Sequence, residues 1–367
     1  MYSFGISLLV SLCISLLIVR WAQGNGQAFL LDHDLEGVQK MHDTPVPRVG
    51  GVAIFLAALV GAGLIWLRDA WNGAAILWLI ACSLPAFLGG VIEDVTKRVR
   101  PRWRMACMAV SCFLAFWLLS LAIPRTEIVA LDSILVAWRP VALGLTLFAL
   151  LTITNAVNLI DGFNGLAGVV TTLIFGALGW VAYQVGDSLV LSASLMLAGS
   201  IVGFLYWNYP HGRIFLGDGG AYFLGFMVGA LAISLVQRNP VVSAWFPVLL
   251  LAYPLVEVAF SIYRRKILRG TAPGQPDAAH LHQLIFKRVV GRASGKRADD
   301  APALRNALTS PYLWALSLLA IGPAALCYDR TPILVGLFCV FCVSYVWLYR
   351  RIATFRVPRW LLKLRRR

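Results

Sequence analysis

A series of long apolar runs constrains this chain more than any other feature of its sequence. The runs centre near residues 12, 58, 82, 114, 149, 175, 198, 229, 251, 319 and 341. A helix needs about 20 apolar residues to cross a bilayer, where all of its backbone polar groups must be bonded within the segment. The sequence therefore predicts an all-α polytopic membrane protein with about eleven transmembrane helices.

The composition supports a lipid environment. Hydrophobic residues make up 59% of the 367 residues and charged residues only 13%, whereas soluble domains carry about 25% charged residues. The net charge of +15 comes from basic residues that lie between the apolar runs. Such a distribution favours an anionic membrane surface as the partner, and we expect the chain to bind the lipid bilayer and no nucleic acid.

The positions of Lys and Arg predict the orientation. If the N-terminus is outside, 26 of the 32 Lys and Arg residues fall in inner segments and five in outer connections. Cytoplasmic loops carry such an excess, so we expect an external N-terminus and a cytoplasmic C-terminus. The first run, 3–19, has no preceding Lys or Arg and is followed by Arg20, which indicates an uncleaved anchor rather than a signal peptide.

The remaining sequence predicts one transmembrane catalytic domain over 1–350 and a basic cytoplasmic tail over 351–367. The domain includes a cytoplasmic loop, 263–310, with an amphipathic helix expected from about Ala278 to Val290. No internal repeat of the kind found in many secondary transporters is visible.

Polar residues stand out at the predicted inner helix ends, where an ionisable group next to lipid is costly and is a functional hypothesis by default. The first cluster is KMHDTPVPRVGG, residues 40–51. Lys40 and Arg48 would lie beside backbone amides at a helix N-terminus, which is a natural anion site. The alternative is that these two cations only hold the cytoplasmic end of the helix at the membrane surface, as the positive-inside rule describes.

The second cluster is GGVIEDVTKRVRPRWR, in which Glu93 and Asp94 end the third span and Lys97 follows. Adjacent carboxylates at a membrane boundary either hold a divalent cation, shift in pKa so that one acts as a base, or pair with the arginines beyond them. The sequence leaves these alternatives open.

The third cluster is NAVNLIDGFNGLAG. Asn155, Asn158 and Asp161 are spaced by three, so a helix would carry them on one face. We expect them to bind a polar ligand or a metal, with interhelical hydrogen bonding as the alternative.

The fourth cluster is RIFLGDGGAYFLGF, with Asp218 at the start of the eighth span. The carboxylate either serves only as a helix cap or binds a hard cation, since Mg²⁺ takes one or two carboxylates together with substrate phosphate oxygens. This motif alone does not separate the two.

Two further candidates are His280 and His282 in HLHQ. No third ligand completes a zinc site nearby. Contact with a phosphate or nucleotide is the functional interpretation, and a solvated surface pair is the alternative.

Together these clusters place carboxylates and cations at one membrane face. Phosphoryl transfer asks a protein mainly to position reactants and offset negative charge, which Mg²⁺ and Lys or Arg side chains accomplish. A site at the inner leaflet implies one reactant carried by lipid and one from the cytosol.

The motifs resemble those of the polyprenyl-phosphate N-acetylhexosamine-1-phosphate transferases. KMHDTPVPRVGG, LGGVIEDVTK, NAVNLIDGFNGLAG, FLGDGGAYFLG and HLH occur in the family's order, and the spans between them fit over residues 1–350. The resemblance implies that undecaprenyl phosphate attacks the β-phosphorus of a UDP-N-acetylhexosamine and releases UMP, with Mg²⁺ (or Mn²⁺) as cofactor. It also implies a bacterial inner-membrane enzyme with a cytoplasmic site, and it leaves a homodimer open.

The resemblance also implies roles for individual residues. Asp94, with Glu93 beside it, would be catalytic, Asp161 a second essential carboxylate, and Asp218 a metal ligand together with Asp94. Asp94 either deprotonates the lipid phosphate for direct attack, which we favour, or takes part in a covalent two-step route. The residues expected to contact substrates are Lys40, Arg48, Lys97, Asn155, Asn158, His280 and His282.

Two departures from the family pattern narrow the prediction. Glu93 stands where the family usually has an aspartate, which puts its contact with a metal in doubt. The peptidoglycan branch, which uses UDP-MurNAc-pentapeptide, shows three consecutive histidines where this chain has HLHQ. We therefore expect a WecA-like enzyme that uses GlcNAc or a related sugar to start a cell-surface polysaccharide. The phospho-MurNAc-pentapeptide transferase is the alternative, and a secondary transporter a remote one.

Overall fold

The structure is a computed structural model that describes residues 2–25, 46–268, 279–291 and 302–354. Within these ranges the secondary structure is helical, without a β-strand. The first elements are α1 (Tyr2–Asn25), α2 (Gly50–Arg68), α3 (Ala70–Thr96), α4 (Pro101–Leu119), α5 (Val129–Ala137), α6 (Arg139–Ile160), α7 (Leu166–Val185), α8 (Ser188–Asn208) and α9 (Gly217–Arg238). The others are α10 (Phe246–Leu250), α11 (Ala252–Tyr263), η1 (Arg264–Leu268), α12 (Leu281–Ile285), η2 (Phe286–Val290), α14 (Pro302–Ala307), α15 (Ser310–Leu326) and α16 (Thr331–Ala353).

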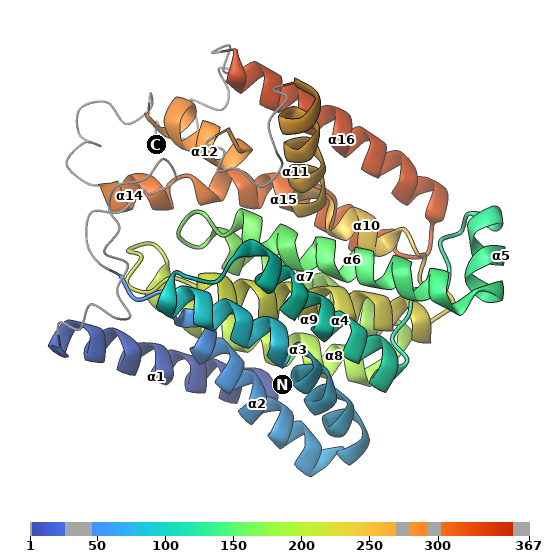
Figure 1. The fold of residues 1–367 in the computed structure, drawn as a ribbon, viewed down its shortest axis with the longest axis horizontal. Helices are drawn as coiled ribbons and strands as arrows, with labels where there is room; N and C mark the ends of the chain where they lie inside the picture. Colours follow the sequence, from blue (N-terminus) through green and yellow to red (C-terminus); the bar gives the residue numbers. More distant parts are fainter. Residues whose placement is uncertain (1, 26–45, 269–278, 292–301, 355–367) are drawn as a thin grey trace.

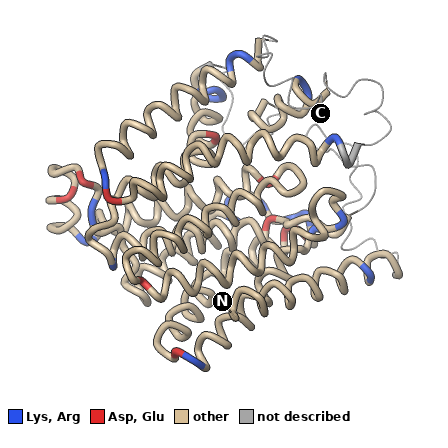
Figure 2. The backbone as a smooth tube through the Cα atoms, turned by 180° about the vertical axis from the view of Figure 1, so that it is seen from behind, with Lys and Arg blue, Asp and Glu red and all other residues tan. Residues whose placement is uncertain are grey.

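The long helices run back and forth between two ends of the molecule (Figure 1). We call them the α12 end, which also holds α14, and the α5 end. Helices α3, α6 and α8 finish at the α12 end, and α2, α7 and α9 begin there. Lys, Arg, Asp and Glu gather mainly toward these two ends, while the chain between them is almost free of charge (Figure 2). This is the charge distribution that a bilayer demands.

Ten helices of the described chain are long and apolar enough to cross a membrane without interruption. An eleventh crossing is broken at Leu251 into α10 and α11. It begins at the α5 end, where the Ser243 amide donates to the Tyr328 carbonyl over 2.9 Å, and η1 continues it at the α12 end. The prediction of an all-α protein with about eleven transmembrane helices is confirmed, with one crossing interrupted.

Helix α9 lies at the centre and is buried along almost its whole length. Its start is crossed closely by α2 and α3 at glycines. A Cβ on Gly51 would lie 2.3 Å from the Gly220 Cα, and one on Gly90 would lie 2.4 Å from the Gly219 nitrogen. The double glycines of three separate sequence motifs therefore meet at one point, where only backbone fits.

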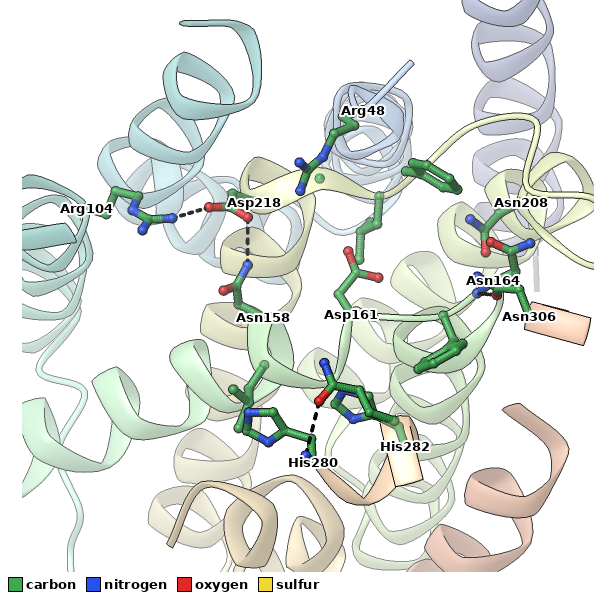
Figure 3. Close-up of a pocket in the computed structure, with 17 residues that line it drawn as sticks. Arg48, Arg104, Asn158, Asp161, Asn164, Asn208, Asp218, His280, His282 and Asn306 are labelled. Atoms are coloured by element: carbon green, nitrogen blue, oxygen red, sulfur yellow. Dashed lines mark hydrogen bonds and ion pairs between the residues drawn. The ribbon is translucent and has the colours of Figure 1, made fainter. Parts of the chain in front are cut away.

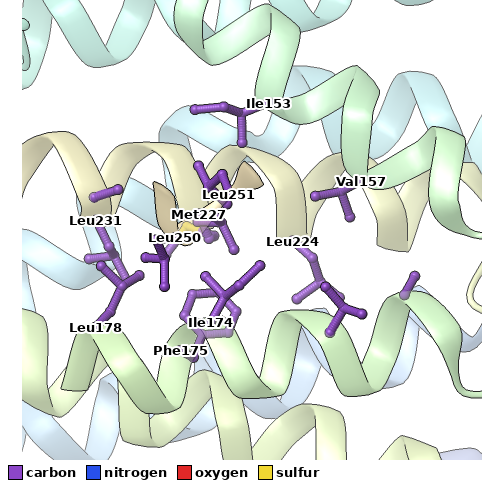
Figure 4. Close-up of a cluster of buried hydrophobic side chains, with 14 of the residues drawn as sticks. Ile153, Val157, Ile174, Phe175, Leu178, Leu224, Met227, Leu231, Leu250 and Leu251 are labelled. Atoms are coloured by element: carbon purple, nitrogen blue, oxygen red, sulfur yellow. The ribbon is translucent and has the colours of Figure 1, made fainter. Parts of the chain in front are cut away.

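The middle of the bundle is packed with apolar side chains from α6, α7, α9 and the α10–α11 junction (Figure 4). Phe175 and Met227 are wholly buried there. Lipid is as apolar as these side chains, so van der Waals packing rather than exclusion of water holds the helices together. The packed middle leaves the helix ends as the place for polar chemistry.

Helix α1 is an integral member of the bundle. A Cβ on Gly199 of α8 would lie 2.3 Å from the Phe4 carbonyl oxygen, and one on Gly203 would lie 2.3 Å from that of Leu8. The Trp207 indole also donates to the Leu12 carbonyl over 3.1 Å. Such close packing agrees with the expected role of the first run as an anchor.

Candidate active site

A cavity of about 370 Å³ opens at the α12 end (Figure 3). It lies between the end of α6, the connection from α8 to α9, and α12. Its lining is mostly polar and comprises Arg48, Arg104, Asn158, Leu159, Asp161, Gly162, Phe163, Asn164, Asn208, Phe215, Leu216, Gly217, Asp218, His280, His282, Gln283 and Asn306.

Asp218 lies in the first turn of α9 and faces this cavity. Its Oδ2 is 2.6 Å from Nη1 of Arg104 and accepts a hydrogen bond from the Tyr222 hydroxyl over 3.3 Å. Its Oδ1 accepts from the Asn158 amide over 3.0 Å. Among the described residues it makes no capping bond to its own helix. The structure thus gives Asp218 side-chain partners at the cavity wall.

Asp94 lies directly behind Asp218 and is buried. Its two carboxylate oxygens accept hydrogen bonds from the backbone amides of Asp218 and Gly219, each over 2.9 Å. Asp94 therefore caps α9 from the end of α3, where its charge also meets the positive end of the α9 dipole. It does not line the cavity itself. By bonding to the backbone N–H of Asp218, it fixes the backbone position from which the Asp218 side chain extends.

Gly217 permits this contact. Its φ of +76° is costly for any residue with a side chain. A Cβ at this position would lie 2.1 Å from the Arg48 carbonyl oxygen and 2.6 Å from Oδ2 of Asp94. The glycine before Asp218 therefore lets three motifs converge.

Asp161 differs from both of these carboxylates. Helix α6 ends at Ile160 and Asp161 leaves the helical path with a ψ of 58°, so the expected row on one helix face is broken. Its carboxylate points into the cavity on the side of Arg48 (Figure 3), without a hydrogen bond or ion pair to any residue in the described ranges. Burial raises the pKa of Asp161 to about 7, opposed by the positive charge of Arg48.

The other members of the sequence motifs lie outside the cavity. Asn155 does not line it, although Asn158 does. Oε2 of Glu93 accepts from the Val99 amide over 2.8 Å, and Lys97 is exposed with a φ of +55°. The four carboxylates singled out in the sequence do not share one pocket, because Glu93 faces the turn after α3 and Asp94 lies behind the start of α9. The predicted residue Lys40 lies outside the described residues.

His280 and His282 both line the cavity and are each only 3% exposed. The alternative of a solvated surface pair is therefore wrong. Their rings stack, with centroids 5.3 Å apart and planes 6° apart, and the ring of Phe163 meets His282 edge-on. Burial lowers the pKa of His282 to about 4, so this imidazole is neutral at physiological pH.

Sequence reasoning missed Glu257, which is fully buried and hydrogen-bonded to His280. A lone carboxylate inside an apolar run was the available signal. It also gave Arg104 no role apart from its basic neighbours, and it missed the asparagines that fix the loop after α6. The backbone N–H of Asn164 donates to Oδ1 of Asn306 over 2.8 Å. The backbone N–H of Gly165 donates to Oδ1 of Asn208 over 2.7 Å.

The donor set bears on whether a metal fits. No group of three His, Cys, Asp or Glu side chains within the described chain is placed to hold an ion unaided. Asp161 and Asp218 nevertheless face the same cavity, and the Asp161 carboxylate has no hydrogen bond or ion pair with the residues that the structure describes. Such a pair fits Mg²⁺ taking further oxygens from phosphate and water, and it does not resemble a preformed protein cage.

Comparison with known proteins shows which family this chain resembles. The family model for glycosyl transferase family 4 matches residues 76–236. The Bacillus subtilis (strain 168) protein named probable undecaprenyl-phosphate N-acetylglucosaminyl 1-phosphate transferase is 30% identical over 294 residues, covering 77% of this chain and 76% of its own. The undecaprenyl-phosphate alpha-N-acetylglucosaminyl 1-phosphate transferases of Yersinia pestis and Escherichia coli (strain K12) are each 26% identical, covering 91% of this chain and 88% and 87% of their own lengths.

The fold and the site therefore define a multi-pass membrane enzyme that transfers a phosphosugar. The chain belongs to glycosyl transferase family 4, in its WecA-like group. The resemblance seen in the sequence motifs is confirmed at the level of the family.

Proposed function

We propose that this protein transfers an N-acetylhexosamine 1-phosphate, with GlcNAc 1-phosphate as the expected group, from its UDP-sugar to undecaprenyl phosphate. The products are UMP and a lipid-linked sugar diphosphate that starts a cell-surface polysaccharide. One observation carries the proposal: Asp161 and Asp218 share a cavity with Arg48 and Arg104 at an end of the helices. The names of the relatives supply the acceptor and the sugar.

We also propose that the enzyme depends on Mg²⁺, with Mn²⁺ as a substitute. Asp218 and Asp161 would hold the ion, and Asp94 would support them from behind through the start of α9. When bound, the ion offsets the negative charge of the transferred phosphoryl group. Arg104 has to release Asp218 for this to occur, because their present distance is 2.6 Å.

The side chains of the cavity have separate tasks in this proposal. Arg48 and a released Arg104 bind phosphate oxygens, since guanidinium groups recognise phosphate through paired donors. Asn158 keeps Asp218 oriented. The buried histidines His280 and His282 form the opposite wall, where they would contact the donor. Lysines 40 and 97 would add positive charge along the approach.

The bonding of Asp94 supports direct attack by the lipid phosphate. Both of its oxygens are already engaged by backbone amides of α9, so a covalent role would first require the loss of the helix cap. A phosphate monoester is already a nucleophile and needs only positioning and charge compensation. Asp94 then acts by holding α9 in place.

We place the α12 end on the cytoplasmic side of a bacterial inner membrane. Most of the Lys and Arg residues in the described part of the chain lie in segments at this end. A site there meets both a cytosolic sugar nucleotide and a lipid whose phosphate lies at the inner leaflet.

The test uses the full chain purified in lipid nanodiscs. Undecaprenyl phosphate and Mg²⁺ are supplied with UDP-GlcNAc, UDP-GalNAc or UDP-MurNAc-pentapeptide separately, and released UMP and the lipid product are measured. We expect UMP release with a UDP-N-acetylhexosamine and its loss when EDTA or no lipid is present. Release with UDP-MurNAc-pentapeptide alone, or with none of the three, would refute the proposal.

A further inference from the structure

Glu257 of α11 is a carboxylate that the proposed reaction does not use. It is completely buried. Its Oε1 lies 3.0 Å from Nδ1 of His280 and accepts from the Leu281 amide over 3.3 Å. Its Oε2 accepts from the Tyr345 hydroxyl over 2.7 Å. A buried carboxylate with this set of donors joins α11, α12 and α16 at the wall of the cavity.

The bonding of His280 fixes which ring nitrogen carries the proton. Its Nε2 lies 3.2 Å from Nη2 of Arg265. A guanidinium only donates, so Nε2 must be the acceptor in this contact. The neutral ring then carries its proton on Nδ1, which donates to Glu257. A carboxylate on one ring nitrogen is the usual means of setting the tautomer and orientation of a histidine.

His282 has none of these partners, although it is stacked on His280. Its Nδ1 is buried without a hydrogen bond within the described chain. Burial lowers its pKa to about 4, so its ring stays neutral beside an anion. The two histidines of the HLH motif therefore differ in their hydrogen bonds: within the described chain, His280 is bonded to a carboxylate and His282 is not.

We propose that Glu257 is a positioning residue for His280. It holds the ring in the tautomer that leaves Nε2 as an acceptor, which the Arg265 guanidinium now occupies. When a phosphate oxygen of the sugar nucleotide draws Arg265 away, the negative charge of Glu257 lets Nε2 take a proton from water and donate it to that oxygen. His282 serves as a neutral contact. This inference rests on the proposed function for the identity of the anion. The charged or titratable groups around His280 are Glu257, Arg264, Arg265, His282, Tyr345 and Tyr349.

The first test compares Glu257→Gln with a matched control on the same helix. The amide of glutamine keeps the size of the side chain but removes the charge. We expect kcat/KM for UMP release to fall by roughly 10²-fold, in the range that a positioned acid or base contributes. Tyr253→Phe removes a buried hydroxyl without a hydrogen-bond partner in the described chain, and should leave kcat/KM within about twofold.

A double-mutant cycle separates positioning from packing. If Glu257 acts through His280, adding Glu257→Gln to His280→Gln should cause little further loss of kcat/KM, because the second change removes an interaction already lost. The acid limb of the kcat/KM profile should also move with Glu257→Gln. Losses that multiply, or an unchanged pH profile, would mean that Glu257 only supports the fold.

Nitrogen-15 NMR of histidine-labelled wild-type protein tests the tautomer even if a variant does not fold. Of the five histidines, the His280 signals are assigned by their loss in His280→Gln. We expect a protonated Nδ1 and an unprotonated Nε2 without substrate. When UDP-GlcNAc is added, the Nε2 resonance should move upfield, as it does when this nitrogen gains a proton. An Nε2–H tautomer in the wild type would overturn the inference. A wild type inactive toward every UDP-sugar would instead overturn the proposed function.

Discussion

The two ends of the bundle hold the same kinds of charged residue in different states (Figure 2). At the α5 end, Asp187 caps its own helix by accepting from the Val190 amide over 3.1 Å. Its other oxygen accepts from Arg238 over 2.8 Å and from Asn239 over 2.9 Å. At the α12 end, Asp94 caps a helix that begins more than 120 residues later in the chain. One cap is local, and the other assembles a site.

The arginines show the same contrast. Arg125 at the α5 end donates to the backbone carbonyls of Val236 and Pro240 over 3.1 and 3.0 Å, so its charge ties together a connection between helices. Arg104 at the α12 end binds Asp218 at the cavity wall and keeps a buried Nε without a partner in the described chain.

Two side chains of the cavity also keep a buried nitrogen without a hydrogen-bond partner in the described chain. Buried polar atoms are almost always hydrogen-bonded, and each exception asks for an explanation. Nδ1 of His282 and Nε of Arg104 are such exceptions among the described residues, and both side chains line the cavity. The others are the hydroxyls of Ser11, Ser15, Ser194 and Tyr253 and Nε of Arg305, which lie outside it. Both ends contain aspartates and arginines, so the residue types do not distinguish them. The hydrogen-bond partners of these side chains do.

The largest expected effect comes from neutralising one aspartate at each end. Asp218→Asn should lower UMP release by at least about 10³-fold, because the change removes charge compensation for the transferred phosphate. Asp187→Asn should leave turnover within about threefold and cost about 1 kcal/mol of stability, since asparagine still caps a helix and Arg238 is half-exposed to solvent.

The measurement is UMP release together with thermal unfolding of each purified variant. The wild type and Asp218→Asn should unfold within a few degrees of each other. Retained turnover in Asp218→Asn at normal Mg²⁺ would remove Asp218 from the proposed metal site and abolish the distinction between the ends.

Two glycines with the same backbone conformation sharpen the comparison. Gly186 at the α5 end has a φ of +75° and Gly217 at the α12 end one of +76°. A Cβ on Gly186 meets nothing within 4 Å, whereas one on Gly217 collides with the Arg48 carbonyl. Gly186→Ala should cost about 1 kcal/mol, the strain of the left-handed conformation alone. Gly217→Ala should also reduce kcat on the order of 10²-fold by displacing the site.

Circular dichroism melts and UMP release distinguish the two outcomes. Equal effects of Gly186→Ala and Gly217→Ala on kcat would contradict the idea that the α9 start is held at backbone contact.

Much of the fold was predictable because lipid leaves few choices. Apolar runs of spanning length predicted all of the crossings, including the one near residue 251. Its break at Leu251 had a signal that was not used, because Pro254 has no backbone N–H to donate to the Leu250 carbonyl. Successive crossings end at the α12 end and the α5 end in turn, as they must when each helix crosses the membrane once.

The site was predictable in composition and less so in geometry. Asp161, Asp218 and the histidines were expected, and all line the cavity. Asn155, Glu93 and Asp94 were expected with them and do not line it. Glu93 turns toward Val99, and Asp94 bonds to the start of α9. The end of α6 at Ile160 also takes Asp161 off the helix face of Asn155 and Asn158. Sequence spacing fixes the face of a helix, but not where that helix stops or what its end contacts.

A smaller effect concerns the ion pair between Arg104 and Asp218. Arg104→Gln removes the cation that now binds Asp218, so binding of Mn²⁺ without substrate should tighten roughly 2- to 5-fold, the size expected for a partly exposed charge pair. Arg125→Gln at the α5 end should leave Mn²⁺ affinity unchanged. Electron paramagnetic resonance of free Mn²⁺ measures both. Weaker binding in Arg104→Gln would show that Arg104 does not compete with the ion.

The last expected effect is on stability rather than turnover, and it comes from the pH response of His282. Burial lowers its pKa to about 4, below the ordinary value, so protonation favours the unfolded chain. The contribution to stability is therefore complete above about pH 6.5 and is lost as the pH falls toward 4, which amounts to about 2 kcal/mol at pH 5. Asp161, whose pKa is raised, acts in the opposite direction, so the wild type must be compared with His282→Gln, which retains Asp161.

Thermal unfolding of both proteins at pH 7.5 and pH 5 measures this difference. The difference in free energy of unfolding between the wild type and His282→Gln should shrink by about 2 kcal/mol at the lower pH. The corresponding difference between the wild type and a control, His211→Gln, should be the same at both pH values, because His211 is exposed. A constant gap would mean that His282 gains a proton without loss of stability. The imidazole would then have an acidic partner or access to water in the folded protein, and the division of the HLH motif into one proton-sharing and one neutral ring would have to be abandoned.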